Sequence, residues 1–280
     1  MLEKKMAWIS AAAGRQLALD ISFPSATAPE AGWPLLIFAH GFKGFKDWGH
    51  WNALAEAFAQ AGYAFLKFNF SHNGLGQNLI DFEDLAAFGQ NNYSKECFDF
   101  EAVLDFIQKS DWPIQKTAPV LIGHSRGGPI AALTALKRGA KALISWASVH
   151  ELDYAWQNEA ILAHWKKEGR QFIRNGRTKQ NMPLDYQLYE DFKAHEEAFR
   201  LGPKLVDLSC PYLIVHGNQD PAVSLTSAHY LDEHCPQAEL LIIEGADHVF
   251  GGRHPFPEGA ALPPHSQILF RACLDFLAKL

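Results

Sequence analysis

A serine stands within a glycine-rich stretch in which its hydroxyl could act as a nucleophile. Residues 121–128 read LIGHSRGG, so Ser125 has a glycine two positions before it and another two positions after it. The stretch lies between an apolar run typical of a strand and a segment with helical spacing, which is the context that a G-x-S-x-G motif requires. Small neighbours are needed there because larger side chains would collide with a sharply turned backbone. The alternative is a glycine-rich strand-to-helix turn in which the serine has no chemical role.

The same turn could also stabilise negative charge on a reacting oxygen. Backbone N–H groups at the start of a helix point at such a charge and lower its energy. Such helix-starting N–H groups are expected beside Ser125, so we assign the first of these donors to the N–H of Arg126. The turn would then supply a nucleophile and half of an oxyanion hole.

Several short apolar runs alternate with stretches of helical periodicity, which predicts an α/β protein with a mostly parallel central sheet flanked by helices. The expected strands are residues 35–39, 64–70, 120–123, 142–147, 212–216 and 240–244, and the expected helices are 48–60, 93–109, 129–138 and 267–279. Residues 6–10 and 16–23 are expected to form an antiparallel hairpin at the edge of the sheet.

The alternation of apolar runs and helical stretches is interrupted between about residues 151 and 207. Aromatic residues occur there among many charges, without a clear buried strand. We expect a helical cap inserted into a single domain that spans residues 1–280. The aromatic and basic residues of the cap could contact substrate, but such stripes are more often the buried and solvated faces of helices.

In its G-x-S-x-G motif and in the order of its expected elements, the chain resembles the α/β-hydrolase superfamily over nearly its full length outside the cap. The segments GHSRGG, HGNQD and GADH are most similar to small esterases and to acyl-peptide-hydrolase-like catalytic domains, including relatives of cinnamoyl esterases. The family carries its nucleophile, acid and histidine in that order along the chain. This sequence offers each of them at a matching place.

The resemblance implies a catalytic triad completed by Asp220 and His248. Residues 213–220, LIVHGNQD, resemble the family's acid loop, and residues 241–248, LIIEGADH, resemble its histidine loop. In such a triad the histidine takes the proton of the serine and the carboxylate orients the histidine. We expect Asp247 to point elsewhere. The competing interpretations are a helix-capping role for Asp220 and a surface position for His248.

The resemblance also assigns the second oxyanion donor to the backbone N–H of Phe42. This residue lies in the segment HGFKGFKD, residues 40–47, which could instead form only a tight turn. The next such segment, NFSHNGLG at residues 69–76, is similar to the family's glycine-rich turn, with Asn69 in place of the usual acidic residue. We interpret it as structural and expect His72 at the surface, with a position at the edge of the site as the alternative.

These residues predict acyl transfer to water, in which the serine attacks a carbonyl, an acyl-enzyme forms and water hydrolyses it. An ester is the expected substrate because an alkoxide leaves easily, whereas an amide nitrogen must be protonated. A small-molecule carboxylic ester is therefore the expected partner of a serine carboxylesterase. A peptidase, a thioesterase, a haloperoxidase or a C–C hydrolase of the same fold remain alternatives, as does a binding protein that has lost turnover.

The composition of the chain limits the classes of partner that it could bind. The formal net charge is −6, so the chain has no large positive field for nucleic acid. Its 13 histidines include no HExxH or comparable spacing, and we predict neither a metal nor another cofactor. No apolar run is long enough to suggest a membrane span.

The cysteines and the N-terminus bear on the compartment. Four cysteines lie far apart with no CxxC pair, which favours a reducing compartment, and we expect the cytoplasm. Lys4 and Lys5 precede an apolar stretch that loosely imitates a secretory signal, but this stretch is short and is interrupted by Ser10. We therefore interpret residues 6–10 as a first strand and keep a signal peptide as the alternative.

Overall fold

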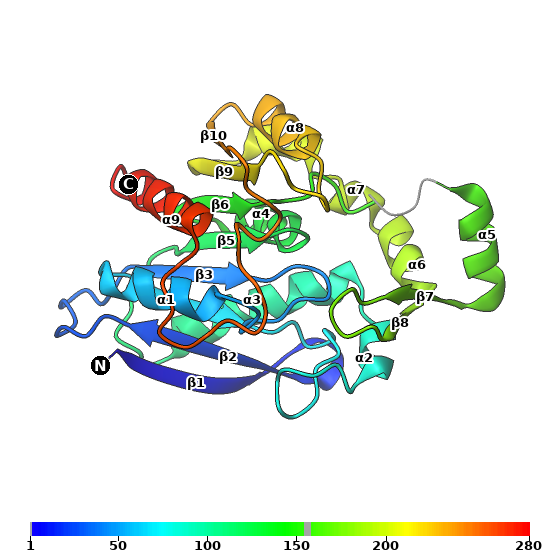
Figure 1. The fold of residues 1–280 in the computed structure, drawn as a ribbon, viewed down its shortest axis with the longest axis horizontal. Coiled ribbons are helices and arrows are strands. Elements are labelled where there is room, and N and C mark those ends of the chain that lie inside the picture. Colours follow the sequence, from blue (N-terminus) through cyan, green and yellow to red (C-terminus); the bar gives the residue numbers. More distant parts are fainter. Residues whose placement is uncertain (1, 154–157) are drawn as a thin grey trace.

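Eight strands form one twisted sheet with helices on both faces (Figure 1). The computed structural model describes residues 2–153 and 158–280. The strand order is β1-β2-β4-β3-β5-β6-β9-β10. The strands are β1 Glu3–Ser10, β2 Gln16–Phe23, β3 Leu35–Ala39, β4 Ala64–Phe68, β5 Val120–His124, β6 Ala142–Trp146, β9 Tyr212–Gly217 and β10 Ala238–Ile243.

The direction of the strands agrees with the sequence patterns. The pairs from β4 to β10 are parallel, whereas β1 pairs with β2 and β2 with β4 in the antiparallel sense. Every residue of β3, β4, β5 and β6 is buried, as expected of parallel strands covered on both faces. The predicted mostly parallel sheet and its antiparallel edge hairpin are confirmed.

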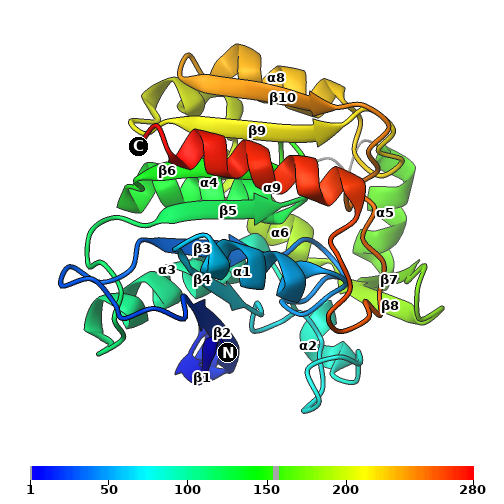
Figure 2. The same cartoon turned by 60° about the vertical axis from the view of Figure 1, so that its left-hand side comes forward.

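Each face of the sheet packs against its own set of helices. Because successive side chains of a strand point to opposite faces, Leu121 joins the core on one face and Ile122 the core on the other. The two helices α1 and α9 cover one face, and Figure 2 shows them in front of the sheet, with α3, α4 and α8 behind it. Their bounds are α1 Trp51–Gln60, α3 Tyr93–Lys109, α4 Gly127–Arg138, α8 Thr226–His234 and α9 Pro264–Leu277. In the described residues no helix is long and apolar enough to cross a membrane.

The insertion between β6 and β9 contains more than helices. Its elements are α5 Glu159–Glu168, β7 Arg170–Arg174, β8 Asn181–Asp185, α6 Gln187–Ala194, α7 Glu196–Phe199 and a 3-10 helix at Gly202–Asp207. The expected helical cap is present in α5, α6 and α7, but it also contains an antiparallel hairpin of β7 and β8 that was not predicted. No residue of β7 is buried, and β8 has only Met182 and Pro183 buried, of which a proline is unusual in a strand, so the sequence carried no strand signal. Residues 154–157 of the expected cap lie outside the described residues.

Candidate active site

Ser125 occupies a strained turn at the carboxyl end of β5. Its φ of 54° lies in the left-handed region, which a residue with a side chain seldom adopts. The turn is fixed on both sides, since the N–H of Ser125 donates to the carbonyl of Trp146 at 2.9 Å and its own carbonyl accepts from the N–H of Gly128 at 3.0 Å. The serine thus stands at the edge of a parallel sheet where ligands of α/β proteins usually bind.

The glycines around the serine are required by close backbone approaches. A Cβ at Gly123 would lie 2.3 Å from the carbonyl oxygen of Gly127, and one at Gly127 would lie 2.4 Å from that of Ala39. A Cβ at Gly41 would lie 2.8 Å from the Cβ of Ser125. The G-x-S-x-G spacing therefore has a steric cause, and the loop after β3 lies directly against the serine.

Asp220 and His248 meet at the same edge of the sheet. Nδ1 of His248 is 2.8 Å from Oδ2 of Asp220, whose side chain is only 1% exposed. The other carboxylate oxygen accepts from the N–H groups of Ala222 at 2.7 Å and Val223 at 2.9 Å. Asp220 thus caps its own turn, as the competing interpretation held, and also contacts the histidine.

The environment of Asp220 keeps it ionised. Burial alone would raise the pKa of this carboxyl, but the hydrogen bond from His248 and the two backbone donors hold the pKa below its usual value. A carboxylate only accepts hydrogen bonds, so Nδ1 of His248 must carry the proton. This tautomer leaves Nε2 free to accept one.

His124 connects the histidine loop to the nucleophile. Its Nε2 lies 2.9 Å from the backbone carbonyl of His248, and the two imidazole rings are 4.8 Å apart. Burial lowers the pKa of His124 to about 3, so the ring is neutral and donates this hydrogen bond. Within the described chain no hydrogen bond joins Oγ of Ser125 to His248; such contacts often tighten only when substrate binds.

Asp247 turns away from the site, as expected. Its Oδ1 accepts from the N–H of Gly251 at 2.8 Å and from that of Val249 at 3.2 Å. The carboxylate therefore stabilises the loop that follows the histidine and is not the partner of its ring.

The two residues predicted to donate oxyanion hydrogen bonds pack against each other. The ring of Phe42 stacks on Phe88 with centroids 5.5 Å apart, and the guanidinium of Arg126 lies 4.1 Å from the ring centre of Phe42. Arg126 is buried and forms a 2.6 Å ion pair with Glu96, which is also buried. The sequence offered no sign of Glu96 beyond its place on the expected helix 93–109. These contacts hold the backbone of the nucleophile turn beside the loop after β3.

The turn after β4 is more deeply buried than expected. The prediction of a surface position for His72 is wrong, because this side chain is 3% exposed and its Nδ1 lies 2.8 Å from Oγ of Ser71. The N–H of Ser71 donates to Asp99 at 2.7 Å, which draws the turn inwards. Asn69 is also buried, and its Oδ1 accepts from the N–H of Lys46 at 2.8 Å. A structural role for Asn69 agrees with these contacts.

The family described as the alpha/beta hydrolase family matches residues 36–261, and the chain belongs to it. It is thus a member of a family of hydrolases. Among residues 2–153 and 158–280 no three histidine, cysteine, aspartate or glutamate side chains are grouped so as to hold a metal ion.

Individual relatives are distant. The chain is 26% identical to a proposed esterase/lipase of Mycoplasma pneumoniae over 76% of this chain and 81% of that protein. It is 25% identical to the uncharacterized peptidase YtmA of Bacillus subtilis over 44% of this chain, and this match spans only 43% of the peptidase. The solved structure of Est1E from Butyrivibrio proteoclasticus with ferulic acid superposes with a TM-score of 0.71 at 21% identity, covering 98% of each chain. That likeness concerns the fold alone.

Proposed function

We propose that this hydrolase cleaves small carboxylic esters through an acyl-enzyme, with Ser125 as nucleophile, His248 as general base and Asp220 as the group that orients the base. The observation that carries the proposal is the 2.8 Å hydrogen bond between His248 and a buried, ionised Asp220, at the sheet edge where Ser125 has a strained backbone. The backbone N–H groups of Phe42 and Arg126 are the proposed oxyanion donors.

The reaction follows from the tautomer of His248. As Oγ of Ser125 attacks the ester carbonyl, Nε2 takes the hydroxyl proton and the ring becomes an imidazolium that Asp220 stabilises. The carbonyl oxygen becomes an oxyanion, which the two N–H groups would bind. The imidazolium then protonates the departing alkoxide. Water attacks the acyl-enzyme by the same steps, which releases the acid and restores the serine.

The experiment combines covalent labelling with turnover. We expect a fluorophosphonate probe to label the wild type on Ser125, and p-nitrophenyl acetate or butyrate to be hydrolysed. Loss of the serine from such a triad costs on the order of a million-fold in kcat, so Ser125→Ala should show neither. Ser25→Ala removes an exposed serine and serves as the matched control. Equal hydrolysis by the wild type and Ser125→Ala would refute the proposal.

The scissile bond is tested in the same assay. Aminoacyl anilides and acyl-CoA are included because one relative is named a peptidase and the fold does not fix the leaving group. A feruloyl ester is included because ferulic acid is bound in the Est1E structure. We expect kcat/KM to be highest for simple esters, and preference for an anilide or a thioester would replace the ester assignment. Absence of labelling in folded protein would favour a binding protein.

The compartment and the partners form a separate proposal. We propose a cytoplasmic location without nucleic-acid or membrane partners. The proposal is supported by the free thiols of Cys97, Cys210, Cys235 and Cys273. Fractionation of the source cells tests it.

A further inference from the structure

A cavity of about 580 Å³ lies between the β1–β2 hairpin and the loop after β4. We propose that it is a second, non-catalytic site for a neutral polyhydroxylated ring, the sugar part of a glycoside or glycan, which stacks on Trp8. This volume falls within the range of small-molecule sites, about 300–1,000 Å³. None of Ser125, Asp220 and His248 lines the cavity. The proposal therefore does not depend on the proposed function.

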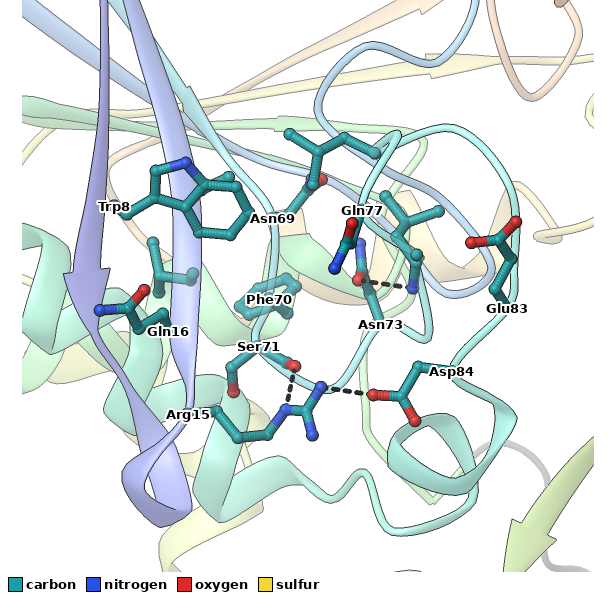
Figure 3. A pocket seen from close by; sticks show the side chains of 15 residues that line it. Trp8, Arg15, Gln16, Asn69, Phe70, Ser71, Asn73, Gln77, Glu83 and Asp84 are labelled. Atoms are coloured by element: carbon teal, nitrogen blue, oxygen red, sulfur yellow. Dashed lines mark hydrogen bonds and ion pairs between the residues drawn. The ribbon is translucent and has the colours of Figure 1, made fainter.

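Trp8 provides a flat apolar wall. It is 50% exposed on the edge strand β1. Its partner in register on β2 is Ala18, which is too small to cover the indole, and Gln16 follows two residues away on the same face. Figure 3 shows the indole on one side of the cavity and Asn73 and Gln77 on the other. An indole offers an apolar face and an N–H donor, which suits the C–H face and the hydroxyls of a sugar ring.

Two amide groups in the wall have unused hydrogen-bond donors. Asn69 and Asn73 line the cavity, and their Nδ2 groups have no hydrogen-bond partner within the described chain. Their oxygens are engaged, that of Asn69 by the N–H of Lys46 and that of Asn73 by the N–H of Leu75 at 3.3 Å. Each amide is therefore oriented with its donors unpaired. Both nitrogens are buried beneath the wall, and unpaired buried donors are unfavourable, so an amide that turns toward the cavity would gain by pairing with a ligand rich in acceptor oxygens.

Charge around the cavity excludes other ligand classes. Arg15 is already bound, at 2.6 Å by Asp84 and at 3.0 Å by the carbonyl of Ser71, and Figure 3 shows both contacts. An anion would meet Glu83 and Asp84, and Arg15, the one cation that lines the cavity among the described residues, is already paired with Asp84. A cation has no acceptor to offer the two amide donors, and an apolar ligand would leave them unpaired. A neutral ring with hydroxyl groups fits all of these features.

The test is a titration of the full-length protein with neutral disaccharides, namely xylobiose, cellobiose and maltose, followed by calorimetry and by tryptophan fluorescence. Glucuronate and choline serve as the anionic and cationic probes. We expect saturable binding of at least one neutral sugar and weaker binding of both charged probes. Absence of saturation by every neutral sugar, or tighter binding of a charged probe, would overturn the proposal.

Variants locate the binding. Trp8→Ala is expected to weaken sugar binding by about tenfold. Met6→Ala is the matched control, because Met6 is 52% exposed on the same face of β1 but does not line the cavity, and it should bind like the wild type. Gln77→Ala on the exposed loop gives a second test if Trp8→Ala fails to fold. Unchanged binding in the folded wall variants, or loss of binding in Ser125→Ala, would place the sugar elsewhere and refute the site.

Discussion

Replacement of Asp220 by asparagine should reverse the tautomer of His248 without disturbing the fold. One carboxylate oxygen accepts from the N–H groups of Ala222 and Val223, and the other faces Nδ1 of His248. An asparagine must keep its only oxygen toward the two backbone donors, so its NH₂ group faces Nδ1. The ring then accepts at Nδ1 and carries its proton on Nε2, where it cannot take the proton of Ser125.

The expected loss is large and confined to turnover. In a serine triad an aspartate-to-asparagine change of this kind lowers kcat by about 10⁴, because the tautomer is wrong while the geometry is kept. We expect a fall of that order in kcat for p-nitrophenyl butyrate with little change in KM, and a matching fall in the rate of fluorophosphonate labelling. Thermal unfolding should remain close to that of the wild type because the side chains are isosteric.

Asp247→Asn provides the matched control. This neighbouring carboxylate accepts from the N–H groups of Val249 and Gly251 and does not contact the imidazole of His248, so asparagine preserves its bonds. Its kcat should stay within about threefold of the wild type, as is usual away from a reacting group. If Asp220→Asn retained activity within about tenfold of the wild type, the tautomer argument would be wrong.

Three further predictions concern stability. Gly127→Ala should destabilise the protein by about 1–3 kcal/mol in urea unfolding, because its Cβ would meet the carbonyl of Ala39, whereas Gly176→Ala, with nothing within 4 Å, should have little effect. Glu96→Ala should cost about 3–5 kcal/mol because it removes the buried carboxylate that pairs with the buried guanidinium of Arg126. Its control, Glu101→Ala, breaks the more exposed pair with Lys137 and should cost about 1 kcal/mol or less; equal losses would refute the burial argument. Acid should also destabilise the fold, because burial lowers the pKa values of six histidines, which unfolding would return to 6.5. They are His40, His50 and His72, each at about 4, His124 at about 3, and His216 and His254, whose pKa values are also lowered. Their stabilisation is present above pH 6.5 and is lost as the pH falls through these values. Asp99, whose pKa burial raises to about 6, opposes the effect by one proton. The four histidines with values near 3 and 4 then leave a net uptake of about three protons on unfolding near pH 5.5, so the free energy of unfolding falls by at least roughly 4 kcal/mol for each unit that the pH falls. A flat urea midpoint between pH 6.5 and 5 would contradict this.

The sheet could be predicted because its strands are short apolar runs with distinct ends. Residues 35–39 and 93–109 have the same bounds in the structure as in the sequence analysis. The small helix α2, Leu85–Gly89, was missed because five residues carry no periodicity. The hairpin of β7 and β8 was missed because a two-stranded ribbon buries few side chains, and Phe172 within it is 62% exposed.

Only the residues of the site that lie in a recognisable sequence motif could be predicted. The segments around Ser125, Asp220 and His248 indicated which loops to bring together, and the sheet order places β5, β9 and β10 so that their carboxyl ends share one edge. Contacts between side chains that are far apart in the chain produce no local sequence motif. The pair of Glu96 with Arg126 depends on how α3 packs beside α4, and no local pattern encodes it.

The insertion between β6 and β9 is part of the core packing rather than an appendage. Met182 of β8 is fully buried in a cluster with Phe82 and Phe88, and Phe42 packs against that cluster from the loop after β3. Elsewhere in the insertion, Trp165 is fully buried and joins the core that contains Leu121. If the hairpin were removed, this apolar cluster would face water beside the proposed oxyanion loop. The insertion therefore helps to hold the site, and its contribution to specificity must be separated from this structural effect by single substitutions at exposed positions.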